Sequence, residues 1–309
     1  QACLVGFAIG DALAAPIEDM IRDQVIGAKP IADYSKAPPS HPIGHLDPGQ
    51  YSDETQLMLL IAESLVEKKT FNADDLAHRF IDWYQTQKFR SSWRFPSNTM
   101  MKACRKLASG TPWSQSGFPS AGVIAAARTV PLGLVYWRHP GLLKDAVDKS
   151  CKMTHTDPRV MGAALVLATA IRLGLEGIEP TPDLVITAAL EKAQLYAIEL
   201  VRRLKLVKDL LRVELPAAIQ QIGNGGFCLE AVPAALHCFL RNPRKFDEMI
   251  ISAANIGGDS DAIAAMAGAI FGAFHGLAAI PAHWLDKLEN IDHLKQLGAD
   301  LYRLTVPQR

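Results

Sequence analysis

The segment AAMAGAIFGAF at residues 264–274 decides the fold class. It consists of alanine, glycine and larger apolar residues, a composition that suits a helix packed closely against other helices in a core. Outward from it, apolar residues recur at helical spacing, which predicts further helices at residues 57–66, 76–84, 160–175, 184–211 and 229–240. The segment VPLGLVYW at residues 130–137 is the nearest to a strand, but it also fits a buried helix. We therefore predict an all-α fold.

The composition bounds the domain count and the class of partner. The chain has 309 residues, of which 49% are hydrophobic, and 32 basic side chains balance 32 acidic ones. This length is compatible with two domains, but no shift in composition and no long repeat divides the chain, so we predict one domain over residues 1–309. A formal charge of zero disfavours a nucleic-acid surface and attraction to anionic membranes, since both need a surplus of basic residues.

The cysteines and the apolar segments indicate the compartment. Five cysteines are widely spaced and form no CxxC motif, so neither a disulfide scaffold nor a zinc site is indicated. We find no signal peptide, and the longest apolar runs, at residues 160–171 and 262–274, are shorter than the roughly 20 residues that a membrane-spanning helix needs. We therefore predict a soluble, cytoplasmic protein without a membrane partner, and we favour a monomer.

Acidic residues beside glycines and apolar segments carry the information about function. The first are Asp11 and Glu18 in GDALAAPIED, residues 10–19. They would lie on one face of a continuous helix, but Pro16 kinks or ends a helix. Glu18 therefore lies either on a kinked continuation or just past the helix end. In the absence of a function, Asp11 would bind a neighbouring loop and Glu18 would be a solvated residue.

A second acidic group follows a serine. Ser52 is suited to cap a helix, and Asp53 and Glu54 would occupy the first turn, where the helix dipole favours negative charge. This arrangement needs no function. It also offers a hydroxyl and two carboxylates, the hard oxygen ligands that Mg²⁺ or Mn²⁺ prefers. Both interpretations stay open at this point.

The strongest signal is GGDSD at residues 257–261, directly before the apolar helix. Gly257 and Gly258 allow backbone conformations that other residues avoid. Asp259 and Asp261 then open the helix, and at a helix start both side chains can turn toward one cation. Because a buried carboxylate is costly unless it is paired or binds a metal, this motif predicts a metal site.

A histidine precedes another predicted helix. Asp157 and Pro158 are typical of an N-cap and a first helical residue, and His155 lies in the loop just before them. A single loop histidine is more often a packing residue than a catalyst. No GxSxG, HExxH or P-loop motif occurs, and no cysteine is paired with a histidine in a nucleophilic arrangement.

Six motifs together resemble those of the ADP-ribosylglycohydrolase family, in the family order and over nearly the whole chain. They are GDALAAPIED at 10–19, YSDETQ at 51–56, SAGVIAAARTVPLG at 120–133, MTHTDPRV at 153–160, GNGGFCLEAVPAAL at 223–236 and GGDSDAIAAMAGAIFGA at 257–273. The combination of SDET with GGDSD is specific, whereas a single motif would not be. The resemblance implies a compact orthogonal bundle of helices with two Mg²⁺ or Mn²⁺ ions in a central cleft.

The resemblance also implies roles for individual residues. The metal ligands would be Ser52, Asp53, Glu54, Asp259 and Asp261. Glu18 would take part in acid–base chemistry beside the ions, and Asp53 and Glu54 would be further catalytic residues. The ADP-ribose pocket would be lined by Asp11, Gly122, Val123, His155, Gly225, Gly226 and Phe227. Backbone amides of the glycine loops would hold the diphosphate, as helix N-termini hold anions.

Departures from the family pattern bear on the function. Ala262 stands where the family usually has a threonine that ligates the second ion, so that ion would lose one protein oxygen and would either take a water in its place or bind weakly. Glu54 replaces the commoner aspartate, and Val123 replaces a small residue of the phosphate-facing loop. The segment WRFPSNT at residues 93–99 lacks the catalytic aspartate that arginine-directed members carry, which weakens the case for ADP-ribosylarginine as the substrate.

Two functions from different classes follow from the resemblance. The first is a metal-dependent glycoside hydrolase that cleaves the bond between ADP-ribose, or a related ribosyl nucleotide, and a protein side chain or small-molecule acceptor. The second is a catalytically weak or inactive member that binds ADP-ribose or has a structural role, as lens crystallins of the family do. The retained acids favour the hydrolase, whereas Ala262 and Phe95 favour the second function.

Overall fold

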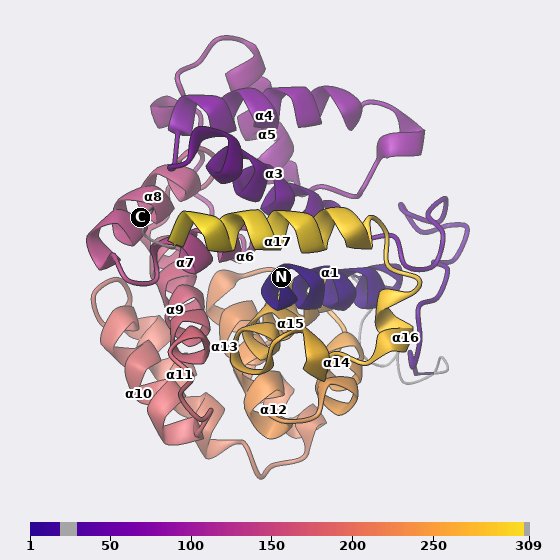
Figure 1. Ribbon diagram of the computed structural model, residues 1–309, viewed down its shortest axis with the longest axis vertical. Coiled ribbons are helices and arrows are strands. Elements are labelled where there is room, and N and C mark those ends of the chain that lie inside the picture. The colour runs from indigo at the N-terminus through magenta and orange to yellow at the C-terminus, as the bar shows by residue number, and fades with distance from the viewer. Residues whose placement is uncertain (19–29, 306–309) are drawn as a thin grey trace.

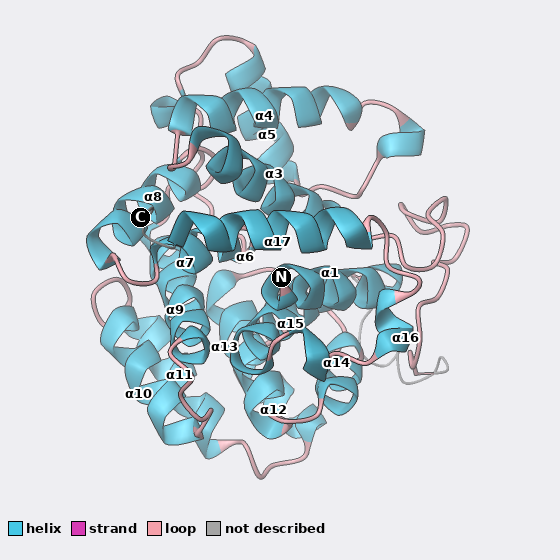
Figure 2. Ribbon diagram, viewed as in Figure 1, coloured by secondary structure: helices cyan, strands magenta, loops and turns pink. Residues whose placement is uncertain are grey.

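Helices make up the regular structure of the described residues. A computed structural model describes residues 1–18 and 30–305, and their regular elements are all helices (Figure 2). In these residues extended pairing is limited to two isolated bridges, Phe118 with His155 and Gly122 with Phe227. The predicted all-α fold is confirmed, and VPLGLVYW lies in the helix α7 and the residue after it.

The elements follow one another along the chain in this order, with η marking a short 3₁₀ helix: α1 (Ala2–Ala14), η1 (Ala15–Ile17), α3 (Asp53–Lys68), α4 (Ala73–Thr86), η2 (Arg90–Ser92), α5 (Asn98–Ala108), η3 (Trp113–Gln115), α6 (Ile124–Ala127), α7 (Val130–Tyr136), α8 (Pro140–Lys152), α9 (Pro158–Leu175), α10 (Pro182–Ala193), α11 (Ile198–Asp209), α12 (Leu215–Ile222), α13 (Cys228–Arg241), α14 (Phe246–Ala254), α15 (Ser260–His275), η4 (Leu277–Ala279), α16 (Ala282–Leu285) and α17 (Ile291–Thr305).

The centre of the core is a pair of helices from opposite ends of the sequence. Every residue of α1 is buried, and its most extensive packing is along α15. The two backbones touch: a Cβ on Gly6 would lie 2.3 Å from the carbonyl oxygen of Gly268, and a Cβ on Gly10 would lie 2.2 Å from that of Ala264. These distances are far below van der Waals contact, so the crossing depends on glycine. The segment at 264–274 thus provides the surface against which α1 packs.

The remaining helices surround this pair. Figure 1 shows α3, α4 and α5 at one end of the molecule, α10, α11 and α12 at the other, and α1 with α15 between them. The helix α17 packs against α1, α3 and α7, and α9 packs against α10 and α15. The prediction of one helix over residues 184–211 is wrong in one respect: α10 ends at Ala193, α11 begins at Ile198, and the two helices pack against each other.

One described helix has the length and apolarity of a membrane span. This is α9, Pro158–Leu175, but 78% of the helix is buried inside the protein. A core helix of a globular protein has the same properties, and α9 packs against several other helices.

Three helix ends position the acidic residues. After α1 ends at Ala14, the short η1 contains Pro16, which lacks an amide hydrogen, and Glu18 then has an extended backbone with ψ 143°. Glu18 therefore lies past the helix end, the second of the two alternatives. The starts of α3 and α15 lie nearby and carry the SDET and GGDSD motifs.

Candidate metal centre and cleft

The acidic turn at the start of α3 is held by a hydrogen-bond network. Ser52 caps the helix as predicted, because its Oγ accepts a hydrogen bond from the Glu54 amide at 3.2 Å. The Asp11 carboxylate accepts from the Ser52 amide at 2.9 Å, and from the amide and hydroxyl of Thr55 at 2.9 and 2.6 Å. Asp11 is fully buried and does not line the cleft, so it acts on the site by orienting this turn.

The start of α15 is fastened to the loop before α13. Gly258 has φ +66°, and a Cβ there would lie 2.3 Å from the Asn224 carbonyl oxygen. The same carbonyl accepts a hydrogen bond from the Asp259 amide at 2.8 Å, and the Asn224 side chain donates to the Ile256 carbonyl at 2.9 Å. Asp259 is the N-cap residue of α15 and Asp261 lies in its first turn, as the sequence predicts.

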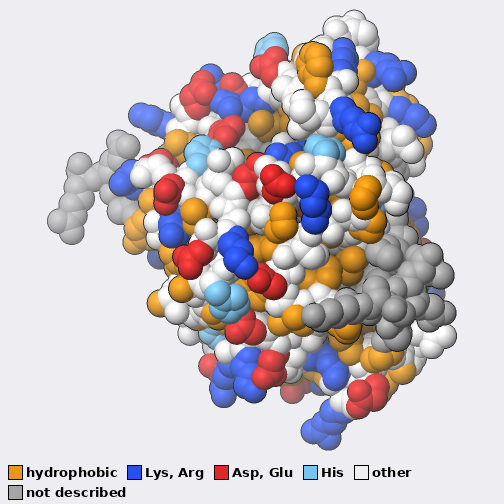
Figure 3. All heavy atoms as spheres, turned by 90° about the vertical axis from the view of Figure 1, so that its right-hand side faces the viewer, with side chains coloured by type: hydrophobic (Ala, Val, Ile, Leu, Met, Phe, Trp, Pro, Cys, Tyr) orange, Lys and Arg blue, Asp and Glu red, His pale blue; other side chains and the backbone are white. Residues whose placement is uncertain are grey.

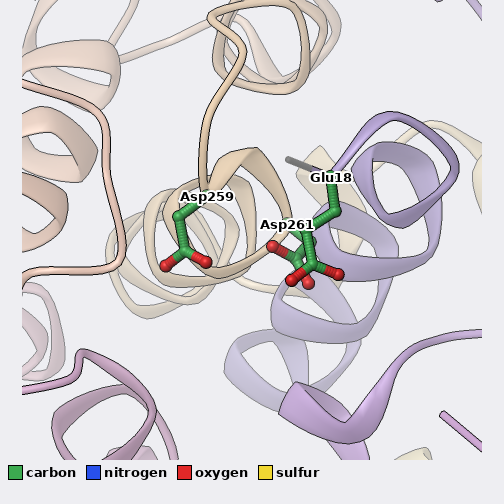
Figure 4. Close-up of side chains that lie close together, drawn as sticks. All are labelled: Glu18, Asp259 and Asp261. Carbon is green, nitrogen blue, oxygen red and sulfur yellow. The ribbon is translucent and has the colours of Figure 1, made fainter. Parts of the chain in front are cut away.

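Three carboxylates converge at this point. Oxygens of Glu18, Asp259 and Asp261 lie within 4.8 Å of one another. Figure 4 shows that the Glu18 side chain comes from the segment after α1, whereas the two aspartates come from the start of α15. Asp53 and Glu54 are outside this tight group but line the same cleft. The hydroxyl of Ser52 joins the two sides by donating to Asp261 Oδ2 at 3.3 Å.

The carboxylates of this region are buried and lie close enough to repel one another. Burial, together with the charges of Asp11 and Asp259, raises the pKa of Asp53 well above its usual range. Burial and the charge of Asp261 do the same to the pKa of Glu54, and burial and Asp259 do so to the pKa of Asp261. A cation placed among these carboxylates would reverse the repulsion.

The donor set fits a hard divalent cation. Every candidate ligand is a carboxylate or hydroxyl oxygen, the ligand type of Mg²⁺ and Mn²⁺. The buried atoms Glu54 Oε2 and Asp261 Oδ1 have no hydrogen-bond partner among the described residues. Ala262 is fully buried and offers only a methyl group. The arrangement can therefore hold a cation, with fewer ligands where a threonine would add one.

The cleft extends from the acids toward two glycine loops and has a volume of about 420 Å³. Gly122, Val123 and Gly226 line it. The amide of Val123 is already bonded to the Gly226 carbonyl at 2.9 Å, and the Gly225 amide donates to Glu230 at 3.1 Å. The amides of Gly226 and Phe227, at the start of α13, donate to no described residue. They are the free donors of this loop, and the positive end of a helix dipole lies behind them.

His155 forms the floor beside the first glycine loop. Its side chain is fully buried, lines the cleft, and directs Nε2 toward Gly122, where a Cβ would lie 3.0 Å from that atom. Nδ1 lies 2.8 Å from the Thr154 hydroxyl. Burial, with a smaller contribution from the charge of Arg128, lowers the pKa of His155 to about 3, so the ring is neutral at physiological pH.

The opposite wall is formed by the segment at residues 93–99, whose lack of an acidic residue is the feature noted from the sequence. Trp93, Phe95 and residues 96–99 line the cleft, and Phe95 has φ +65°, a conformation that favours glycine. Arg94 anchors this wall: its carbonyl accepts from the Asp53 amide at 3.1 Å, and its guanidinium forms an ion pair with Glu289 at 2.9 Å. One feature of the sequence could have pointed to this wall as distinct from the acidic side of the cleft: no acidic residue occurs at positions 83–144.

The surface carries mixed charge on the face that Figure 3 shows, where acidic, basic and hydrophobic side chains are interspersed among the described residues. The described side chains drawn there form no broad basic area. This agrees with the balanced composition of the chain.

Comparisons with known proteins agree with the motifs. The family model described as ADP-ribosylglycohydrolase matches residues 1–309. The chain is 31% identical to an uncharacterized protein of Archaeoglobus fulgidus, over 98% of this chain and 95% of the other. It is 27% identical to the ADP-ribosylhydrolase ARH3 of Mus musculus, over 98% of this chain and 91% of the other.

Two further matches are a bacterial relative and a solved structure. The ADP-ribosylarginine hydrolase Tri1 of Serratia proteamaculans is 27% identical, with 98% of this chain and 78% of that protein covered. A solved "ADP-ribosylglycohydrolase-related protein complex" matches with a TM-score of 0.81 and 27% identity, over 99% of this chain and 97% of the other. On its motifs, its fold and these matches, the chain belongs to the ADP-ribosylglycohydrolase family, a family of glycoside hydrolases.

Proposed function

We propose that this protein hydrolyses the glycosidic bond between ADP-ribose, or a related ribosyl nucleotide, and an acceptor on a protein or a small molecule. The observation that carries the proposal is the convergence of Glu18, Asp259 and Asp261 within 4.8 Å at one side of a cleft. The relatives named as ADP-ribosylhydrolases support it. A glycosidic bond breaks with positive charge developing on the sugar ring, which an acidic cleft favours.

We propose that the acids hold two Mg²⁺ or Mn²⁺ ions. Asp259 and Asp261 would act from one side, and Ser52, Asp53 and Glu54 from the other. Bound cations would neutralise the carboxylates and polarise the ribose hydroxyls. Because Ala262 cannot ligate, the two ions should differ in affinity.

Glu18 is the proposed acid–base residue. It lines the cleft, stands past the end of α1 and is only partly buried, so its carboxyl can exchange a proton with solvent and pass it to the leaving atom of the acceptor. Such a group typically contributes about 10²–10⁴ in rate. Asp53 and Glu54 line the same side and are the candidates for orienting the attacking water.

The glycine loops are the proposed diphosphate site. The amides of Gly226 and Phe227 donate no hydrogen bond to the described residues, and they lie at the start of α13. Gly122, Val123, Gly225 and His155 would complete this part of the pocket. Asp11 would contribute through the turn at Ser52 rather than by touching the ligand.

The wall at residues 93–99 bears on the acceptor. It carries no carboxylate, so nothing on it pairs with a guanidinium leaving group. We therefore propose that an arginine-linked substrate is not the preferred one. We also propose a cytoplasmic location and a monomer of one domain, consistent with the neutral composition.

The second candidate is a member that binds ADP-ribose with weak or no catalysis. The buried methyl group of Ala262 favours it, because the second ion loses a ligand there. The two candidates share the pocket and differ in turnover.

A release assay separates them. Arginine-linked, serine-linked and nucleotide-linked ADP-ribose are incubated with the protein and Mg²⁺ or Mn²⁺, and free ADP-ribose is measured. Release from the serine- or nucleotide-linked substrate that is lost in Glu18→Gln supports the hydrolase. Binding of ADP-ribose without release from any substrate would leave the binding protein as the better description.

A further inference from the structure

A buried cation lies behind the histidine of the cleft. Arg128 is fully buried, yet its guanidinium forms no ion pair with a carboxylate of the described residues. It stacks on the Phe80 ring with 4.8 Å between Cζ and the ring centroid. Burial lowers the pKa of Arg128, which stays at about 10, so the group remains charged at neutral pH. Burying such a charge costs free energy, so the groups that it contacts indicate the role of Arg128.

The guanidinium reaches the histidine through one hydroxyl. Arg128 Nη2 donates to the Ser150 carbonyl at 2.8 Å and to Thr154 Oγ1 at 2.7 Å. The Thr154 hydroxyl lies 2.8 Å from His155 Nδ1. The side chains of Thr154 and His155 are both fully buried, so water does not compete for these bonds.

The direction of each bond follows from the donors and acceptors. Arginine only donates, so the Thr154 oxygen accepts from Arg128 and keeps one proton to give. Among the described residues, the acceptor within hydrogen-bond distance of that hydroxyl is His155 Nδ1. If Nδ1 instead carried the proton, the Thr154 hydroxyl would be buried without an acceptor, at a cost of about 1–3 kcal/mol.

We infer that Arg128, acting through Thr154, fixes His155 as the tautomer with its proton on Nε2, so that the ring presents a hydrogen-bond donor to an oxygen of the ligand. Nε2 fits this role because it lines the cleft and has no hydrogen-bond partner among the described residues. Nε2 is itself buried, and a Cβ on Gly122 would lie 3.0 Å from it, so glycine at this position keeps a side chain from pressing on Nε2. Arg128 and Thr154 are thus positioning residues.

That Nε2 donates to an oxygen of the ligand rests on the proposed function, whereas the tautomer of His155 does not depend on it. The oxygen that Nε2–H would meet belongs to the phosphate or ribose of ADP-ribose. The donor joins the free amides of Gly226 and Phe227, and all three would act on an oxygen-rich ligand. A neutral donor suits this place because it binds oxygen without a titratable charge.

The tautomer is measured by NMR of the ligand-free protein labelled with ¹⁵N at histidine. We expect a pyrrole-like shift at His155 Nε2 and a pyridine-like shift at Nδ1. Thr154→Val removes the hydroxyl with little change in shape, and the two shifts should then move toward each other. Thr154→Ser should restore them. Thr169→Val is the matched control, because Thr169 also has a buried hydroxyl, bonded to the Leu165 carbonyl, but far along α9.

The effect on the ligand is measured with ADP-ribose by calorimetry and, where release occurs, by kinetics. Thr154→Val should weaken ADP-ribose binding about tenfold and raise KM without lowering kcat, with recovery in Thr154→Ser and no change in Thr169→Val. Equal melting temperatures of the Thr154 variants exclude a general loss of folding.

Two results would overturn the inference. One is a wild-type spectrum with the proton on Nδ1. The other is a Thr154→Val spectrum that matches the wild type. A wild-type protein with the expected tautomer but no affinity for ADP-ribose would support the relay and refute the proposed function, so the two can fail separately.

Discussion

At the scale of single residues, Asp11 shows how a carboxylate can serve a site that it does not line. It accepts three hydrogen bonds from the Ser52–Thr55 turn and is completely buried. Asp11→Asn places an amide NH₂ where the donors of this turn converge. We expect the free energy of unfolding to fall by about 1–3 kcal/mol, and Mn²⁺ affinity to fall with it. Chemical denaturation and metal titration measure both effects. Metal affinity equal to that of the wild type would contradict the role in orienting the turn.

The two aspartates of α15 make a second residue-scale prediction. Burial and the charge of Asp259 raise the pKa of Asp261, and Asp259→Asn/Asp261→Asn removes both of these buried carboxylates and their mutual repulsion. The metal-free variant should therefore melt at a higher temperature than the metal-free wild type, while Mg²⁺ and Mn²⁺ should no longer raise its melting temperature. Differential scanning calorimetry with and without metal checks both.

Its matched control is Asp74→Asn, since Asp74 also lies in the first turn of a helix but is exposed. This variant should keep the full metal-induced increase. If Mg²⁺ or Mn²⁺ raised the melting temperatures of the control and of the double variant equally, the proposed metal site at these aspartates would be wrong.

The sequence was sufficient for the helix caps but not for the convergence of acids. Ser52 and Asp157 cap the helices that their residue types and neighbours predict, because capping depends on atoms a few positions away. The tight group of Glu18 with the α15 aspartates depends on the packing of α1 on α15, which no local pattern encodes. The relay from Arg128 to Thr154 has no local signal in the sequence for the same reason, since its members come from separate segments.

At the scale of elements, the crossing of α1 and α15 allows a sharp test. A Cβ on Gly268 would lie 2.0 Å from the Gly6 carbonyl oxygen, so Gly268→Ala must push two central helices apart. We expect a loss of at least about 2 kcal/mol in the free energy of unfolding, measured by urea denaturation.

The control for that test is Gly141→Ala in the first turn of α8. Nothing lies within 4 Å of the added Cβ, and alanine favours a helix over glycine. Its stability should be unchanged or higher by up to about 1 kcal/mol. Two variants of equal stability would contradict the close backbone contact as the basis of the core.

Element boundaries were predicted less well than element types. Periodicity continued through residues 184–211, yet the chain turns at 194–197 and folds α11 back on α10. The apolar spacing is similar on both sides of the break, and neither glycine nor proline occurs in those four residues. The turn is decided by packing against α9 and α13 rather than by a local signal.

At the scale of the whole molecule, the pH dependence of stability should carry the signature of a buried histidine. Burial lowers the pKa of His237 to about 4, although its ring hydrogen-bonds to the Val207 carbonyl. Between pH 6.5 and 4 the unfolded chain therefore binds a proton at His237 that the folded chain rejects, so the contribution of His237 to stability is full above that window and is lost as the pH falls through it. The loss from this residue approaches roughly 3 kcal/mol at the acid end.

His237→Phe should have a shallower decline over that window than the wild type, whatever its stability at pH 7. Urea denaturation at a series of pH values measures the slope. His139→Asn, at an exposed position, should leave the slope as it is. A slope in His237→Phe equal to that of the wild type would show that the buried ring does not control acid unfolding.

The overall charge of zero concealed a separation of charge along the chain. The acids of the candidate site are residues 18, 53, 54, 259 and 261, whereas positions 83–144 hold basic residues and no acidic one. The acid-free stretch supplies both the wall at 93–99 and the glycine loop at 122–123. A total count averages these regions, so it excluded a broad basic surface and could not reveal the cleft.

The pairing of the first and last long apolar helices also constrains the order of events during synthesis. The α1 helix leaves the ribosome long before α15, which begins at Ser260, and its thirteen residues are buried mainly against α15. For most of translation α1 therefore has no native partner, which makes the nascent chain a natural client for chaperones. A chain that stops before residue 259 lacks both the partner of α1 and the aspartates of GGDSD, so such an incomplete copy can neither close the core nor gather the acids.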